Sequence, residues 1–281
     1  VLLPGDGIGP EVVAAAAAVL DAVAARFDHR FSLDRHPIGG VALRAGGRAL
    51  PAATRAACVE ADAVLLGAVG DPEFDGAPRD CRPETALLEL RQTLGVFANL
   101  RPAKVWPGLE GGSSLRPELI DNLDLLIVRE LTGGLYYAEP RGRTADGDAA
   151  FNTMRYTRSE IQRIARVAFE SARLRSGRVT SVDKANVLEV SRLWREVVTE
   201  VATEYPDVIL EHQLVDSCAL LLVSNPRKFD VLLAGNLFGD ILSDEAGAVV
   251  GSLGLLPSAS IGGRGGLFEP VHGSAPDIAG Q

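Results

Sequence analysis

Short apolar runs alternate with longer stretches of helical periodicity along most of this 281-residue chain. Apolar runs bounded by turn residues are typical of buried strands, whereas apolar positions at i, i+3, i+4 and i+7 are typical of amphipathic helices. The pattern predicts strands at 1–3, 63–67, 124–128, 179–182, 208–213 and 230–234. It predicts helices at 11–26, 52–60, 83–95, 158–175, 187–204, 214–224 and 238–253. Strands that alternate with helices indicate an α/β protein.

One segment breaks this alternation. Residues 136–156 are rich in Arg, Asp and Gly, and we interpret them as an arm or hairpin that could pair with another subunit. The chain opens at Val1 inside a predicted strand and closes at Gln281 after a Gly-rich polar stretch. Both ends look cut, and we therefore expect a fragment.

The composition argues against several classes of protein. A formal net charge of −9 provides no basic stripe for a nucleic-acid partner. No apolar run approaches the length of a membrane-spanning helix, so we expect no membrane association. The three cysteines, Cys58, Cys81 and Cys218, lack CxxC spacing. They fit a reducing cytoplasm better than a disulfide framework or a zinc site.

The stretch 236–245 carries the strongest chemical signal. Asp240 and Asp244 are four residues apart in an otherwise apolar run, so a helix places both carboxylates on one face. Carboxylate oxygens suit hard cations such as Mg²⁺ or Mn²⁺. Gly247 and Gly251 extend this stripe at near-helical spacing, which favours room for a ligand. The alternative is a solvated acidic face.

Three glycines, Gly5, Gly7 and Gly9, follow the first predicted strand. The dinucleotide fingerprint requires G-x-G-x-x-G, and here the third glycine comes one residue early and precedes Pro10. We therefore predict a tight strand-to-helix turn. No P-loop motif is present, which excludes P-loop phosphate chemistry.

The helix predicted at 83–95 has one mixed face, made of Glu84, Leu87, Leu88 and Arg91. A core face would be apolar throughout, whereas this one begins with an acid and ends with a base. It could line a pocket that holds an apolar group beside an anion. An ordinary amphipathic helix with charged ends is the alternative.

Other candidate groups stand near the ends of apolar elements. Arg91, Arg101 and Arg129 could clamp carboxylates in a bidentate manner, although a single arginine is commonly part of a structural ion pair. Tyr136 follows two glycines and is a candidate proton donor if a nearby cation lowers its pKa, or else one of an aromatic pair with Tyr137.

The region after the predicted strand 179–182 holds one of only three lysines, Lys184, among 28 basic residues. A lysine kept where arginine is otherwise preferred is a candidate for giving up a proton. Catalytic groups in open α/β sheets follow the strands in this way. Asp216 follows the strand 208–213 and offers a third carboxylate, and His272 lies in a turn-rich loop.

Five stretches together resemble the β-decarboxylating dehydrogenase family, and within it the 3-isopropylmalate dehydrogenases most closely. They are LPGDGIGPE at 3–11, FANLRP at 97–102, RELTGG at 129–134, NLFGDILSDE at 236–245 and HGSAPDIAG at 272–280. The resemblance implies an isopropylmalate dehydrogenase-like two-domain α/β fold, not a Rossmann fold, with a sheet running through both domains. The implied domains are a cofactor-binding domain at 1–96 plus 249–281 and a substrate and dimerisation domain at 97–248. The arm near 136–156 would help to build a homodimer with shared active sites.

The resemblance also implies an activity, the oxidative decarboxylation of 3-isopropylmalate to 4-methyl-2-oxopentanoate with NAD⁺ in leucine biosynthesis. Arg91, Arg101 and Arg129 would hold the malate carboxylates. Mg²⁺ or Mn²⁺ would bind to Asp240 and Asp244, with Asp216 supplied by the partner subunit. Lys184, also from the partner subunit, would be the base, and Tyr136 would protonate C3.

Two sets of residues bear on specificity within the resemblance. Leu87, Leu88 and Val187 suit an isopropyl group and would leave the extra carboxylate of isocitrate unpaired and desolvated. Asp277 would repel the 2′-phosphate of NADP and so favour NAD. The implied cofactor-binding residues are Glu84, His272, Gly273, Ser274, Ala275, Pro276, Asp277 and Ile278.

Two other functions compete with this interpretation. The first is a tartrate- or D-malate-type dehydrogenase of the same family. The second is a Mg²⁺-dependent acid-binding or phosphoryl-transfer protein that uses the aspartates without a nicotinamide; the missing P-loop and the 272–280 loop argue against it.

Overall fold

The structure of the chain is a computed structural model that describes residues 1–78, 81–263 and 265–281. It divides into two compact units, Val1–Val96 with Pro257–Gln281, and Phe97–Leu256. The second boundary lies at 256/257, later than the expected 248/249. The reason is that α9 (Asn236–Val250) and the short 3₁₀ helix η6 (Leu253–Leu255) pack together within the second unit.

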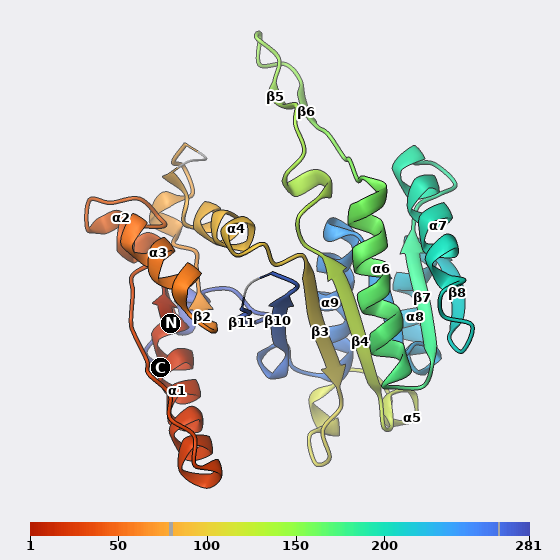
Figure 1. The fold of residues 1–281 in the computed structure, drawn as a ribbon, viewed down its shortest axis with the longest axis horizontal. Coiled ribbons are helices and arrows are strands. Elements are labelled where there is room, and N and C mark those ends of the chain that lie inside the picture. Colours follow the sequence, from red (N-terminus) through yellow and green to blue (C-terminus); the bar gives the residue numbers. More distant parts are fainter. Residues whose placement is uncertain (79–80, 264) are drawn as a thin grey trace. The chain divides into compact units, whose positions relative to one another are not determined.

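The first unit contains a four-stranded mixed arrangement (Figure 1). Its strands in spatial order are β1 (Leu2–Gly5), β2 (Val64–Ala68), β11 (Leu267–Pro270) and β10 (Pro257–Ile261). Strands β1 and β11 are parallel to β2, and β10 is antiparallel to β11. The helices are α1 (Gly9–Phe27), α2 (Gly40–Arg44), α3 (Ala52–Glu60) and α4 (Pro83–Leu94). Helix α1 packs against β1 and β2, and α3 packs against α4.

The second unit is also built of strands and helices. Its strands in spatial order are β3 (Ala98–Lys104), β4 (Asp124–Glu130), β9 (Val231–Ala234), β7 (Arg178–Asp183) and β8 (Ile209–Leu214). Only the β3–β4 pair is antiparallel among these strands. Helices α6 (Arg158–Arg173) and α7 (Glu189–Ala202) lie on one face, and α8 (Val215–Ser224) and α9 lie on the other (Figure 1). The short helix α5 (Pro117–Ile120) precedes β4. Strand β9 is buried throughout, as expected of a parallel strand covered on both faces.

The segment expected to form an arm is an antiparallel hairpin. Strands β5 (Arg141–Arg143) and β6 (Ala150–Asn152) pair with each other and project away from the second unit (Figure 1). The two ends of the arm meet where the backbone N–H of Gly134 donates to the carbonyl of Arg155 at 3.0 Å. Phe151 in β6 is 46% exposed, so the arm leaves an aromatic side chain uncovered within this single chain.

The predicted strands and helices are present, with ends that shift by a few residues, and the α/β class is confirmed. The pattern missed β3, β10 and β11. In β3 the inward positions are occupied by Asn99 and Arg101, both buried, so the strand lacks the apolar alternation that marks a half-buried strand. Within the described residues, no helix combines the length and apolar character needed to cross a membrane.

Candidate active site

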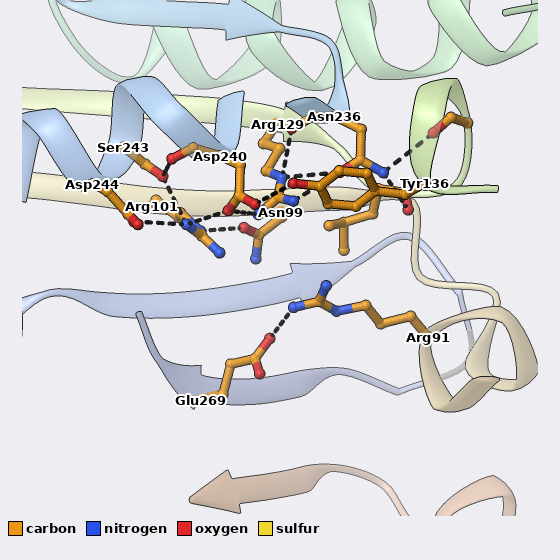
Figure 2. Close-up of polar contacts among 12 residues, drawn as sticks. Arg91, Asn99, Arg101, Arg129, Tyr136, Asn236, Asp240, Ser243, Asp244 and Glu269 are labelled. Carbon is orange, nitrogen blue, oxygen red and sulfur yellow. Dashed lines mark hydrogen bonds and ion pairs between the residues drawn. The ribbon is translucent and has the colours of Figure 1, made fainter. Parts of the chain in front are cut away.

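Two arginines and a tyrosine converge on one aspartate in the second unit (Figure 2). Nη1 of Arg101 lies 3.3 Å from Oδ1 of Asp240, and Nη1 of Arg129 contacts the same oxygen. The Tyr136 hydroxyl donates to Oδ2 of Asp240 at 2.7 Å. Asp244, one turn further along α9, lies 3.5 Å from Nη1 of Arg101. The cluster is therefore a charged network and not a simple solvated acidic face.

Neighbouring strands and one helix bring these groups together. Arg101 lies in β3 and Arg129 in the adjacent β4, while α9 packs across both strands. Helix α9 approaches closely because it carries a glycine at its contact with the strand. A Cβ added at Gly239 would stand 2.7 Å from Cγ of Arg129. In the sequence NLFGD, Gly239 thus leaves the space that Arg129 needs beside Asp240.

The burial of the cluster raises the pKa values of Asp244 and Tyr136. The side chains of Arg101 and Arg129 are only 7% and 2% exposed, whereas the carboxylate side chain of Asp240 is 32% exposed. Burial raises the pKa of Asp244, an effect that the Arg101 charge opposes and the Asp240 charge reinforces. Burial, with the hydrogen bond to Asp240 and its charge, raises the pKa of Tyr136 to about 12. The phenol is thus a protonated donor at neutral pH, and its pKa is raised where the sequence interpretation required a lowered value.

The third carboxylate expected for a metal lies apart from this pair. Oδ1 of Asp216 is 2.5 Å from Nζ of Lys184, and this hydrogen bond is the main cause that lowers the pKa of Asp216. Among the described residues, no three or more His, Cys, Asp or Glu side chains gather in a way that could hold a metal ion. A single chain therefore offers Asp240 and Asp244 as neighbouring carboxylates on one helix face.

Lys184 stands on a hydrogen-bonded turn. Its backbone N–H donates to Oγ of Ser191 at 3.1 Å. The preceding Asp183 is buried, accepts from the backbone of Ala185 and forms two hydrogen bonds with Arg195. Val187 closes the turn through a 3.0 Å bond to the Lys184 carbonyl and is 65% exposed. Lys184 and Val187 are thus presented together from one turn.

Helix α4 in the first unit buries a different face from the one singled out in the sequence. Its core positions are Pro83, Ala86, Leu90, Arg91 and Leu94, while Leu87 and Leu88 are half-buried and Glu84 is exposed. Arg91 forms a buried ion pair with Glu269 in β11 at 2.7 Å (Figure 2). The two leucines lie outside the buried face of the helix, and the pocket interpretation stays a prediction.

The glycine-rich turn after β1 fixes the loop that contains residues 272–278. Gly5 and Gly7 have φ of +72° and +53°, which confirms the predicted tight turn between β1 and α1. The N–H of Ile8 donates to the Ser274 carbonyl at 2.8 Å, and a Cβ added at Gly7 would stand 2.0 Å from that carbonyl oxygen. The turn and the loop are thus one packed structure.

Glu84, another residue expected to bind the cofactor, lies close to the same loop. A Cβ added at Gly70 would stand 3.1 Å from Oγ of Ser274 and 3.4 Å from Oε1 of Glu84. The structure thus places Glu84 close to the loop from a distant part of the sequence. Asp277 and Ile278 are exposed in a short 3₁₀ helix that begins at Pro276.

The interpretation of Gly247 and Gly251 as space for a ligand is wrong. A Cβ added at Gly247 would stand 2.8 Å from Leu256 and 3.0 Å from Leu253, so this glycine lets η6 pack against the helix. Gly251 ends α9 with φ of +99°, and a Cβ there would stand 2.5 Å from the backbone nitrogen of Ser113. Both glycines serve the packing of the helix end.

The sequence analysis missed two buried asparagines in the site. Asn99 accepts from Arg101, and Asn236 accepts from Arg129. Spacing could have found them, because Asn99 lies two residues before Arg101 in a strand and Asn236 lies four residues before Asp240 in a helix. It also missed Ser243, whose Oγ accepts from Arg101 at 2.7 Å.

Comparison with known proteins identifies the family. The family model described as isocitrate/isopropylmalate dehydrogenase matches residues 1–281. A 3-isopropylmalate dehydrogenase of Prochlorococcus marinus (strain MIT 9313) is 61% identical over 284 residues, covering 100% of this chain and 80% of the relative. One of Salinibacter ruber (strain DSM 13855 / M31) is 61% identical over 279 residues, covering 99% and 76%.

Solved structures agree with this assignment. An isocitrate dehydrogenase from Methylococcus capsulatus has a TM-score of 0.88 at 38% identity, covering 99% of this chain and 78% of that one. A β-decarboxylating dehydrogenase from Thermococcus kodakarensis has a TM-score of 0.78 at 39% identity, covering 99% and 76%. The expected fold class is confirmed. The chain belongs to the isocitrate/isopropylmalate dehydrogenase family.

Proposed function

We propose that this protein catalyses the oxidative decarboxylation of 3-isopropylmalate to 4-methyl-2-oxopentanoate with NAD⁺, a step in leucine biosynthesis. The observation that carries the proposal is the convergence of Arg101, Arg129 and Tyr136 on Asp240. Carboxylate binding, control of negative charge and proton donation are the tasks that this reaction sets. The cluster offers a group for each of them.

The arginines bind the two carboxylates of the substrate. Arg101 and Arg129 are buried, so their attraction for an anion is weakly screened by water. The residues of α4 that we assign to the substrate are Arg91, for a carboxylate, and the half-buried Leu87 and Leu88, for the isopropyl group. A hydroxy acid with a second charged group in place of the isopropyl would leave that charge unpaired against the leucines.

Asp240 and Asp244 would hold a divalent cation, with Asp216 of the partner subunit as a third ligand. Their chemistry fits, because two carboxylates one turn apart on α9, Asp240 half-buried and Asp244 exposed, offer the oxygen ligands that suit Mg²⁺ or Mn²⁺. Such a cation would stabilise the negative charge that develops on the substrate.

Two residues of the chain move protons. Lys184, acting in the partner's site, accepts the proton of the 2-hydroxyl as hydride leaves C2 for NAD⁺. Loss of CO₂ follows, because only the 2-oxo acid can accept the electrons of the breaking bond. Tyr136 then donates its proton to C3, and its hydroxyl is already placed in the cluster as a hydrogen-bond donor to Asp240.

The proposal requires a homodimer. Leu220 and Val223 on α8 and Ile241 on α9 are 68%, 44% and 57% exposed, so these helices present an apolar surface that a second copy would cover. The hairpin arm with its exposed Phe151 supports the same assembly. The free thiols of Cys58, Cys81 and Cys218 support a reducing, cytoplasmic location.

An absorbance trace of NADH tests this function. The purified protein with 3-isopropylmalate, NAD⁺ and Mg²⁺ is expected to form NADH, and removal of the cation by a chelator is expected to stop it. If the complete mixture forms no NADH while the protein remains folded, the dehydrogenase proposal is wrong.

Gly7→Ala is expected to weaken NAD⁺ binding selectively. The new methyl group would collide with the Ser274 carbonyl, and the φ of +53° disfavours alanine. We expect KM for NAD⁺ to rise about tenfold or more, because misplacing a binding group by about 1 Å can cost up to about 100-fold. KM for 3-isopropylmalate at saturating NAD⁺ should change little. Gly46→Ala is the matched control, since Gly46 has a positive φ with no atom within 4 Å of the added Cβ. Equal effects of both variants on NAD⁺ would contradict the role of the turn.

Asp277→Ala is expected to narrow the preference for NAD⁺ over NADP⁺. The exposed carboxylate would repel a 2′-phosphate, and its removal relieves that repulsion. The ratio of kcat/KM for the two cofactors is the measurement. An unchanged ratio would exclude Asp277 as the discriminating group.

A further inference from the structure

The two arginines of the cluster are held in the same way, each by a buried asparagine. Nε of Arg101 donates to Oδ1 of Asn99 at 2.7 Å. Nε and Nη2 of Arg129 donate to Oδ1 of Asn236 at 3.1 and 2.8 Å. The asparagines are 0% and 1% exposed. In both pairs the amide oxygen takes the Nε edge of the guanidinium, while Nη1 points to Asp240.

Asn236 is itself fixed from several sides. Its amide Nδ2 donates to the carbonyls of Leu131 and Gly133 at 3.1 and 3.2 Å, which sets which way the amide points. Its backbone N–H donates to the Tyr156 hydroxyl at 2.7 Å. Its backbone carbonyl accepts from Nε of Arg129 at 3.0 Å. The residue therefore joins the start of α9 to the end of β4.

Asn99 holds Arg101 from within the same strand. Residues two apart in a strand share one face, so the short amide reaches Nε of the next arginine directly. Asn99 is also the register partner of Arg129 in β4. The two asparagines thus brace neighbouring arginines from β3 and from α9.

The chemistry of an amide suits this task. A buried Nε–H needs an acceptor, and a carboxylate in that position would neutralise the guanidinium by forming an ion pair. An amide oxygen satisfies the Nε–H without adding a second negative charge to the one that Asp240 already brings to Nη1. We propose that Asn99 and Asn236 are positioning residues that orient the guanidinium groups of Arg101 and Arg129 toward the substrate carboxylates. This rests on the proposed function.

Double-mutant cycles test the proposal. Asn99→Ala and Asn236→Ala are each measured in the wild-type protein and in the Arg101→Lys and Arg129→Lys backgrounds. Lysine keeps the charge but lacks the Nε edge that the asparagine holds. The readouts are kcat/KM for 3-isopropylmalate, KM for NAD⁺, and thermal unfolding as a check on folding.

Each asparagine should act through its own arginine. In the wild-type background Asn236→Ala should lower kcat/KM by roughly 10- to 100-fold with KM for NAD⁺ unchanged. The loss should shrink to about threefold or less with Arg129→Lys but persist with Arg101→Lys. Asn99→Ala should show the reverse pattern. Serine variants replace any alanine variant that does not fold, because serine is too short to reach Nε.

The outcomes separate the two levels of the argument. In one outcome the wild-type protein forms NADH, but each asparagine variant lowers kcat/KM by the same factor in the wild-type, Arg101→Lys and Arg129→Lys proteins. The positioning role is then wrong and the proposed function stands. If the wild-type protein forms no NADH from 3-isopropylmalate, the proposed function fails, and the positioning role falls with it.

Discussion

Lys184→Met is expected to abolish most NADH formation while the fold is retained. Methionine fills nearly the same space but cannot accept the proton of the 2-hydroxyl, so kcat should fall by roughly 10²- to 10⁴-fold, the usual contribution of a general base. Lys184 forms an ion pair with Asp216, whose side chain is 65% exposed, so the pair lies at the surface of the chain. Loss of such a pair has little effect on stability. Steady-state kinetics and thermal unfolding of the same preparation measure both expectations.

Lys228→Met is the matched control for this variant. The Lys228 side chain is 31% exposed, close to the 27% of Lys184, and it also lies near a carboxylate, 3.6 Å from Glu211. It should keep kcat within about twofold, since surface substitutions away from a site have small effects. A near-normal kcat for Lys184→Met would refute its assignment as the base.

Two inactive variants are expected to restore activity when they share a dimer. If Lys184 serves the partner's site, a dimer of one Lys184→Met chain and one Asp240→Asn chain has one intact site, with Asp240 from the first chain and Lys184 from the second. Unfolding and refolding an equal mixture should give about a quarter of wild-type activity, because half of the dimers are mixed and each has one of two sites intact. Activity of the mixture relative to either variant alone is the measurement.

The same experiment exposes the opposite arrangement. If Lys184 and Asp240 served one site within a chain, every site in the mixture would carry a substitution and no activity would return. In each chain Asp216 contacts Lys184, and no larger group of acidic residues forms among the described residues. We therefore expect the mixed dimer to regain activity.

The sequence predicts the fold best where helical period and end signals agree. Helix α6 begins at Arg158 as predicted because Thr157 and Glu160 form a capping box, and its apolar stripe is buried. Strand β3 could not be found in the same way, because Asn99 and Arg101 replace the apolar residues of its inward face. The polar residues of the candidate site thus removed the apolar pattern by which their own strand could have been predicted.

The candidate site divides along a similar line. Local spacing was sufficient to place Asp240 and Asp244 on one helix face. The ion pair of Arg91 with Glu269 joins residues 178 positions apart, so local pattern could not reveal it. Gly247 packs against Leu253 and Leu256, which lie beyond the end of the helix. Spacing within the helix could not reveal these contacts, and the prediction that Gly247 leaves room for a ligand was therefore wrong.

Specificity for the isopropyl group is the part of the proposed function that depends most on Leu87 and Leu88. The structure leaves Leu87 and Leu88 half-buried on α4, outside the core face of that helix. D-malate lacks the isopropyl group and gains nothing from these leucines. A dehydrogenase of the tartrate or D-malate type would not need them.

The most direct measurement compares kcat/KM for 3-isopropylmalate with kcat/KM for D-malate. The reaction is monitored by the absorbance of NADH, and its product is identified. The account predicts a preference for 3-isopropylmalate of at least about tenfold, since a few buried methyl groups are worth roughly 1–3 kcal/mol. It also predicts one 4-methyl-2-oxopentanoate for each NADH. Equal or greater kcat/KM for D-malate, or NADH without that product, would contradict it.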